Sequence, residues 1–170
     1  MAQPEEIVES PGYALCTVGR VVVLVWKQPP AAAGVAETRH RLRMMRERAP
    51  SEKMAFLTVI EPAGTALNVP TEVRDALSAM LKELQKQIAA AAVVVDAEGF
   101  RASLVRTFVA TMNLGNRLEF PSNTERHVIA AARWLAARDP ALAIDANDLA
   151  QAVATLRARW APATAARARL

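Results

Sequence analysis

Ser103 and Arg106 are the residues whose types and spacing come closest to a chemical site. They lie three positions apart in residues 100–113, a segment whose apolar spacing predicts a helix, so they share its outward face. Backbone N–H groups and the helix dipole favour negative charge near the start of a helix. A phosphate on Ser103 would lie near that start, where the Arg106 guanidinium could pair with it. The spacing permits a phosphorylation switch, but the polar outer face of an ordinary helix is the simpler interpretation.

An acidic corner precedes this predicted helix. Asp96, with a second carboxylate two positions later, follows an apolar run. Carboxylates at a strand end can act in acid–base chemistry or hold a metal. No nucleophile or histidine lies near them in the sequence, and a simpler interpretation is that Asp96 caps the turn. With Arg101, Asp96 lies beside Ser103 and Arg106, and we expect these four residues to form a region that binds a protein partner.

The chain offers no recognisable catalytic or metal-binding constellation. His40 and His127 are the only histidines and lie far apart in the sequence, and the arginines around His40 would repel a cation. Cys16 is the single cysteine, so an intramolecular disulfide is excluded, and its apolar surroundings predict a buried, inert thiol. The six glycines are scattered and form neither a phosphate-binding loop nor a nucleophile elbow. We therefore expect no enzyme activity, no cofactor and no metal.

The composition indicates one globular domain with terminal extensions. The 170 residues are 52% apolar and 22% charged, and only 5% are aromatic, so the core must be aliphatic. The acidic N-terminus lacks the basic and apolar regions of a signal peptide, and no segment reaches the roughly 18 apolar residues of a membrane span. These features predict a cytoplasmic protein without an integral membrane segment.

The net charge of +4 comes largely from arginines that concentrate in residues 38–48, TRHRLRMMRER. A helix that binds nucleic acid is expected to combine such charge with a known motif or with stacking aromatic residues, and this segment has neither. We interpret it as a solvated helix face and expect no binding to nucleic acid. If the segment binds anything, an acidic protein surface fits better than DNA.

The order of the predicted elements indicates the fold class. Gly19 supplies the positive φ of a tight hairpin, and the strand after it is a β-branched run that predicts burial on both faces. Strands and helices then alternate, which is typical of a mixed, mostly parallel sheet covered by helices. The prediction is an α/β domain whose sheet has about five strands and begins with a hairpin. The expected strands cover residues 13–18, 21–26, 53–62, 89–97 and 117–122, and the expected helices cover residues 31–50, 70–88, 100–113, 124–138 and 145–160.

The predicted domain covers residues 13–138, preceded by a flexible lead of residues 1–12 and followed by a helical extension of residues 139–170. In the last helix an apolar stripe recurs at three- and four-residue spacing. We expect the stripe to pack back onto the domain. If the helix instead lies free, the stripe is a surface for a homodimer or another partner, with its tryptophan as an anchor. The stripe consists of Leu149, Val153, Leu156 and Trp160.

The element order, the segment AAAAVVVDAEGF (residues 89–100) and the ending FPSNTERHVIAAARWL (residues 120–135) resemble the STAS domain family, the fold of anti-sigma-factor antagonists and their relatives. The resemblance covers the whole predicted domain. It implies a non-enzymatic regulatory module that binds a partner protein, commonly a kinase of a signalling pathway. In switching members, a serine within Asp-Ser-Ser-Gly at the start of the corresponding helix is phosphorylated. Here Ser103 is the only serine nearby, with Ala102 in place of the acidic neighbour and Leu104 in place of the glycine.

Two functional hypotheses follow from the sequence. The first is a non-catalytic regulatory or scaffold module that acts by protein–protein contact, as the resemblance implies. The second is a small-molecule or lipid-binding domain, because the predicted sheet is unusually aliphatic and some STAS-like relatives resemble lipid carriers. An apolar pocket between the sheet and the helices would favour the second hypothesis, and a core without a cavity would exclude it.

Overall fold

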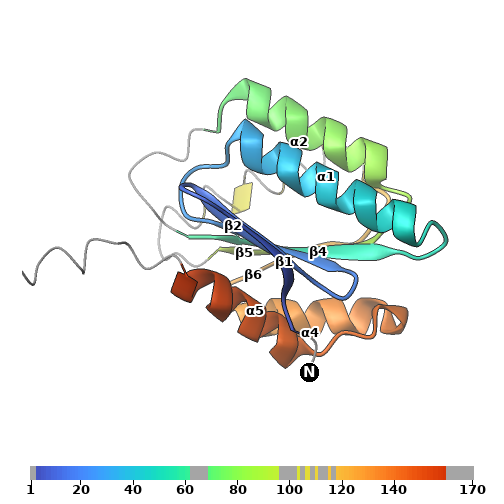
Figure 1. The fold of residues 1–170 in the computed structure, drawn as a ribbon. Coiled ribbons are helices and arrows are strands. Elements are labelled where there is room, and N and C mark those ends of the chain that lie inside the picture. Colours follow the sequence, from blue (N-terminus) through green and yellow to red (C-terminus); the bar gives the residue numbers. More distant parts are fainter. Residues whose placement is uncertain are drawn as a thin grey trace, which may run out of the picture.

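In the part of the chain that the structure describes, six strands form one sheet with helices on both faces (Figure 1). The computed structural model describes residues 3–61, 69–95 and 118–159, together with residues 103, 106, 107, 110 and 115. The strands are β1 (Glu5–Ser10), β2 (Tyr13–Val18), β3 (Val21–Trp26), β4 (Met54–Ile60), β5 (Ile88–Val95) and β6 (Ser122–Glu125). The helices are α1 (Ala32–Arg48), α2 (Thr71–Leu84), α4 (Val128–Arg138) and α5 (Ala146–Arg159), with a short 3₁₀ helix over Pro140–Leu142.

The six strands lie in the sheet in the order in which they occur in the sequence. β1, β2 and β3 pair antiparallel, and β3, β4, β5 and β6 pair parallel. Crossover connections are almost always right-handed, so connections that keep moving in one direction across a sheet place their helices on one face. α1 and α2 accordingly cover one face, and α4 and α5 cover the other (Figure 1). The prediction of a mixed, mostly parallel α/β sheet is confirmed, with six strands in place of five.

The β2–β3 hairpin has the turn and the burial that the sequence predicts. Gly19 has a φ of +54°, in the left-handed region that glycine adopts without steric cost. All six residues of β3 are buried, because α1 covers one face of this strand and α5 covers the other. A strand covered on both faces has no polar side to present, which is why its sequence is a continuous apolar run.

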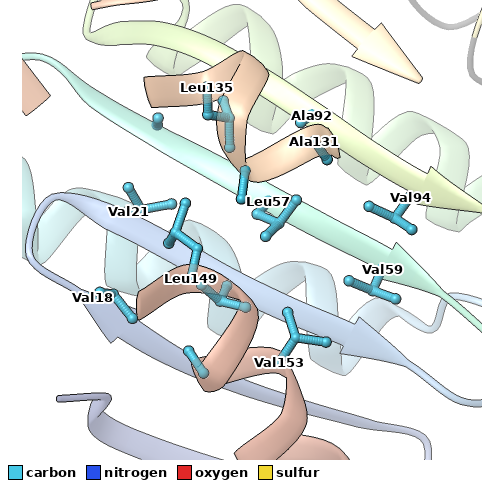
Figure 2. Packing of buried hydrophobic residues seen from close by; sticks show 14 of the residues in the cluster. Val18, Val21, Leu57, Val59, Ala92, Val94, Ala131, Leu135, Leu149 and Val153 are labelled. Carbon is cyan, nitrogen blue, oxygen red and sulfur yellow. The ribbon is translucent and has the colours of Figure 1, made fainter. Parts of the chain in front are cut away.

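Side chains alternate across the sheet and divide the core into two clusters. Figure 2 shows the cluster on the face of α4 and α5, where Leu135 of α4 and Leu149 and Val153 of α5 lie over sheet residues that include Val21 and Leu57. The cluster on the opposite face joins the sheet to α1 and α2. Both clusters are largely aliphatic, as the composition predicts.

The expectation of a flexible lead over residues 1–12 is wrong for β1, which forms an edge of the sheet. Its sequence, EEIVES, is largely polar, so no apolar pattern predicts the strand. The pairing of β1 with β2 contains an irregularity between Glu5 and Val8. Glu6 lies in this irregularity with a φ of 52°, and its carboxylate accepts hydrogen bonds from Arg41 (2.6 Å) and Arg48 (3.0 Å) of α1. Tertiary contacts of this kind order a strand that its own residues do not specify.

The last strand and the helix after it both begin later than the sequence predicts. β6 begins at Ser122, just after Pro121, whose carbonyl accepts a hydrogen bond from the Ala91 N–H at 3.0 Å. α4 begins only at Val128, because the preceding polar residues belong to β6. The apolar residues before Pro121 are therefore a sign of burial and not of strand pairing, since Phe120 is buried without belonging to a strand.

α5 begins and packs as expected. Asp145 precedes it, and its side-chain oxygen accepts a hydrogen bond from the Asn147 N–H at 2.7 Å, which satisfies one of the free donors at the helix start. Leu149, Val153 and Leu156 are all buried in the cluster of Figure 2. The described part of the stripe thus packs back onto the sheet, and these three side chains are not free to bind a partner in this structure.

Candidate functional site

An apolar cavity lies between the sheet and the helices α1 and α2. It is partly open, and its volume is about 100 Å³. An apolar cavity of about 150 Å³ in another protein stays dry and binds benzene, so this space suits a ring-sized molecule or part of a larger one. Among the described residues, the lining contains no charged side chain. It consists of Leu24, Trp26, Pro30, Val35, Thr38, Phe56, Thr58, Ile60, Leu77, Met80, Leu81, Ala91, Val93, Leu118, Phe120 and Ser122.

Neighbouring parallel strands form the floor of the cavity. Their register places Leu24, Thr58 and Val93 side by side on β3, β4 and β5. Phe56 and Ile60 share the same face of β4, because alternate residues of a strand point the same way. These three β4 side chains are only half-buried, although β4 is a central strand of the sheet. Incomplete covering of a central strand is what leaves the space.

The wall beside α1 depends on a glycine. Gly34 lies in the first turn of α1, and a Cβ atom built there would be 2.3 Å from Cη2 and 2.7 Å from Cζ3 of Trp26. The Trp26 indole is 2% exposed and packs tilted against Tyr13, with 5.5 Å between the ring centroids. One turn later, the Thr38 hydroxyl donates a hydrogen bond to the Gly34 carbonyl at 2.8 Å. Glycine therefore lets α1 approach the sheet closely and hold the indole at the edge of the cavity.

Ion pairs connect α1 to α2, the two helices that cover the cavity. The Glu83 carboxylate accepts hydrogen bonds from Arg43 Nε at 2.6 Å and from Arg39 Nε at 2.7 Å, and a second Arg39 nitrogen also contacts it. The hydrogen bond from Arg43, and then that from Arg39, lowers the pKa of Glu83, although burial acts in the opposite direction. Two further arginines of α1 pair with β1. Much of the charge in residues 38–48 is thus neutralised within the protein, which weakens any attraction to an external anion.

A second charged group lies where β3 and β4 end, on the side of α5. The Arg157 Nε of α5 donates to the Glu61 carboxylate at 2.5 Å. Lys27 is buried beside them, and burial lowers its pKa while the nearby Glu61 charge opposes that change. This group connects α5 to the sheet and does not touch the cavity.

The structure describes two of the four residues of the predicted partner-binding region. Ser103 is exposed and Arg106 is half-buried, and both have helical backbone conformation, as the sequence predicts. The Ser103 carbonyl accepts a hydrogen bond from the Thr107 hydroxyl at 2.9 Å. Asp96 and Arg101 lie outside the described residues, and so does Trp160 of the C-terminal stripe. The structure therefore gives the positions of Ser103 and Arg106 on a helix, and their grouping with the other two residues stays a prediction.

The other residues that the sequence singles out are separate from the cavity. Cys16 is fully buried, so the predicted burial of this thiol is confirmed, and burial raises its pKa to about 12. His40 and His127 are both exposed and lie on different helical layers. In the described part of the chain, no group of three or more potential ligands among His, Cys, Asp and Glu could hold a metal ion. None of the helices described there combines the length and hydropathy of a membrane span.

Sequence reasoning raised an apolar pocket only as an alternative and did not identify its residues. Two signals were available. Thr58 interrupts an otherwise apolar strand, and Gly34 interrupts the start of an alanine-rich helix. Neither signal by itself indicates a cavity, because each has several structural explanations. Only the register of β3, β4 and β5 shows that Leu24, Thr58 and Val93 lie side by side.

Comparison of the chain with models of known protein families gives no match. Searches of curated proteins and of solved structures give no match either. The functional argument therefore rests on the cavity and on the residues around it.

Proposed function

We propose that this protein is a binding domain for a small apolar molecule, held in the cavity between α1, α2 and the sheet. The observation that carries the proposal is the lining: thirteen of its sixteen described residues are apolar, and the other three, Thr38, Thr58 and Ser122, are neutral hydroxyl residues. Pockets for small molecules are typically concave and apolar, with few polar groups. Well-packed cores rarely keep such a space, because each lining atom loses contacts.

The expected affinity follows from the size of the cavity. A ring of six carbons that leaves water gains about 0.8 kcal/mol per carbon, or about 5 kcal/mol in total. That free energy corresponds to a Kd of a few tenths of a millimolar. A natural ligand that extends beyond the cavity would bury more surface and bind more tightly.

Benzene is a suitable first probe. In a ¹H–¹⁵N NMR titration we expect saturable shifts of the amides of β4 and β5 around Thr58 and Val93, and little change in α4 on the opposite face. Ala91→Leu should abolish binding, because Ala91 lines the floor and the larger side chain would fill the space. The matched control is Ala137→Leu, the same change at an exposed position of α4, which should leave binding intact. The proposal fails if wild type does not bind benzene or if Ala91→Leu binds it equally well.

The regulatory module implied by the STAS-like resemblance is a second candidate. It is favoured by one observation: the Ser103 hydroxyl is exposed one helical turn from Arg106, where a kinase or another signalling partner could reach it. Ser103→Glu should change the affinity for such a partner. The affinity of Ser103→Ala for the partner should not change after treatment with the kinase. Protein from its native source whose Ser103 carries no phosphate under any growth condition would remove this candidate.

A further inference from the structure

Thr58 occupies the centre of the cavity floor. Its strand neighbours in the register are Leu24 on β3 and Val93 on β5, and both also line the cavity. Along β4, the residues two positions before and after it, Phe56 and Ile60, line the cavity as well. The Thr58 side chain is half-buried and therefore keeps accessible surface on this face of the sheet. A polar group is thus surrounded on four sides by apolar side chains.

The three hydroxyls of the lining differ in their hydrogen bonding. Thr38 donates its proton to the Gly34 carbonyl at 2.8 Å. Ser122 already takes part in an interaction of its own. The hydroxyl of Thr58 makes no side-chain hydrogen bond within the part of the chain that the structure describes. A ligand that fills the cavity would shield the Thr58 hydroxyl from water, and a shielded hydroxyl without a hydrogen-bond partner is unfavourable. Thr58 is therefore the hydroxyl of the lining to which a ligand would best supply a hydrogen bond.

We propose that Thr58 determines the specificity of this cavity, and that the ligand is an apolar molecule with one neutral polar atom, such as a small phenol. This inference rests on the proposed function, since it names the chemical class that the same cavity selects. The polar atom is neutral because the described lining offers no charged side chain to pair with an ion, and an unpaired charge would lose its hydration. A single polar atom suffices because Thr58 supplies a single free hydroxyl.

Binding of phenol and benzene to wild type and to Thr58→Val tests the inference. Valine keeps the shape of threonine and replaces the hydroxyl with a methyl group, and it suits a β-strand, so the fold should be retained. Phenol should bind wild type about five- to tenfold more tightly than it binds Thr58→Val, the effect of one hydrogen bond. Benzene should bind both proteins with equal affinity or bind Thr58→Val slightly more tightly.

Thr38→Val is the matched control, since it makes the same chemical change in the wall of the cavity at a hydroxyl that is already bonded. It should leave the ratio of phenol affinity to benzene affinity as in wild type. An equal ratio in wild type and Thr58→Val overturns the inference, and so does a ratio that changes only in Thr38→Val. If neither probe binds wild type, the proposed function itself fails and this inference fails with it, whereas benzene binding without selection of phenol refutes the inference alone.

Discussion

Gly34→Ala is the substitution for which the structure makes the clearest prediction. In a free helix position this change stabilises a protein by up to about 1 kcal/mol, because alanine has the higher helix propensity. At position 34 the new Cβ would be 2.3 Å from Trp26 Cη2, whereas carbon atoms in contact are about 3.5 Å apart or more. The indole must therefore move by about 1 Å.

The surroundings of Trp26 determine what this movement costs. The ring is buried and packs against Tyr13, so the open space next to it is the cavity. Overpacking of this kind typically costs about 1–3 kcal/mol. The gain in helix propensity offsets up to about 1 kcal/mol of this cost, so Gly34→Ala should lower the free energy of unfolding by about 0–2 kcal/mol relative to wild type. Relative to a Gly→Ala change at an open helical position, the loss should be the full cost of about 1–3 kcal/mol. For a chain of this size the melting temperature should fall by up to about 8 °C relative to wild type.

Urea unfolding followed by far-UV circular dichroism measures the change in free energy. Gly115→Ala is the matched control, because Gly115 has helical conformation and a Cβ atom built there meets no atom within 4 Å. It should be neutral or stabilising. A Gly34→Ala protein as stable as Gly115→Ala would refute the argument from close approach. A destabilised Gly34→Ala protein that binds benzene with unchanged affinity would show that the indole does not move into the cavity.

Two further predictions concern the contacts that hold the helices on the sheet. Glu83→Gln should lower stability by about 0.5–1 kcal/mol at pH 7, because Glu83 pairs with Arg39 and Arg43. Because the pKa of Glu83 is lowered in the folded protein, this stability is present above the ordinary pKa of the carboxyl and is lost as the pH falls through the folded value. The free energies of unfolding of wild type and Glu83→Gln, measured in urea, should therefore converge below about pH 4. A difference that stays constant with pH would contradict this. Leu149→Ala should lower the free energy of unfolding by about 2–5 kcal/mol, because Leu149 is fully buried between α5 and the sheet. The molecular mass of the protein in solution, which reports its oligomeric state, should not change. A smaller loss together with a change of mass would mean that the stripe binds another chain instead.

The sheet order bears on where a ligand can bind. In many open α/β sheets the strand order reverses at one point and leaves a crevice at the carboxyl ends of the strands. Here the strands follow one another in sequence order, so the order contains no such reversal. The cavity is located beneath α1 and α2, and its floor runs from the middle of β4 to the last residues of β3 and β4, Trp26 and Ile60.

The predicted elements succeeded where a pattern is local. The β2–β3 hairpin follows from Gly19 and two apolar runs, and α2 follows from an apolar stripe with helical spacing. The start of α5 follows from the capping side chain of Asp145. Predictions failed for β1 and β6, whose residues are largely polar. Strand pairing there is supplied by the neighbouring strand, and for β1 also by the arginines of α1.

The sequence by itself determined the fold class, the number of strands to within one, the burial of Cys16 and the apolar stripe of the last helix. These properties depend on residues close together in the chain, whose periodicity and turn chemistry are visible in one dimension. Only the tertiary structure decided that β1 closes the edge of the sheet and that Gly34 admits α1 next to Trp26. It alone placed Thr58 among apolar side chains from three strands and two helices. The cavity arises from contacts between residues far apart in the chain, and the packing of those contacts depends on register and on helix approach, which no local pattern encodes.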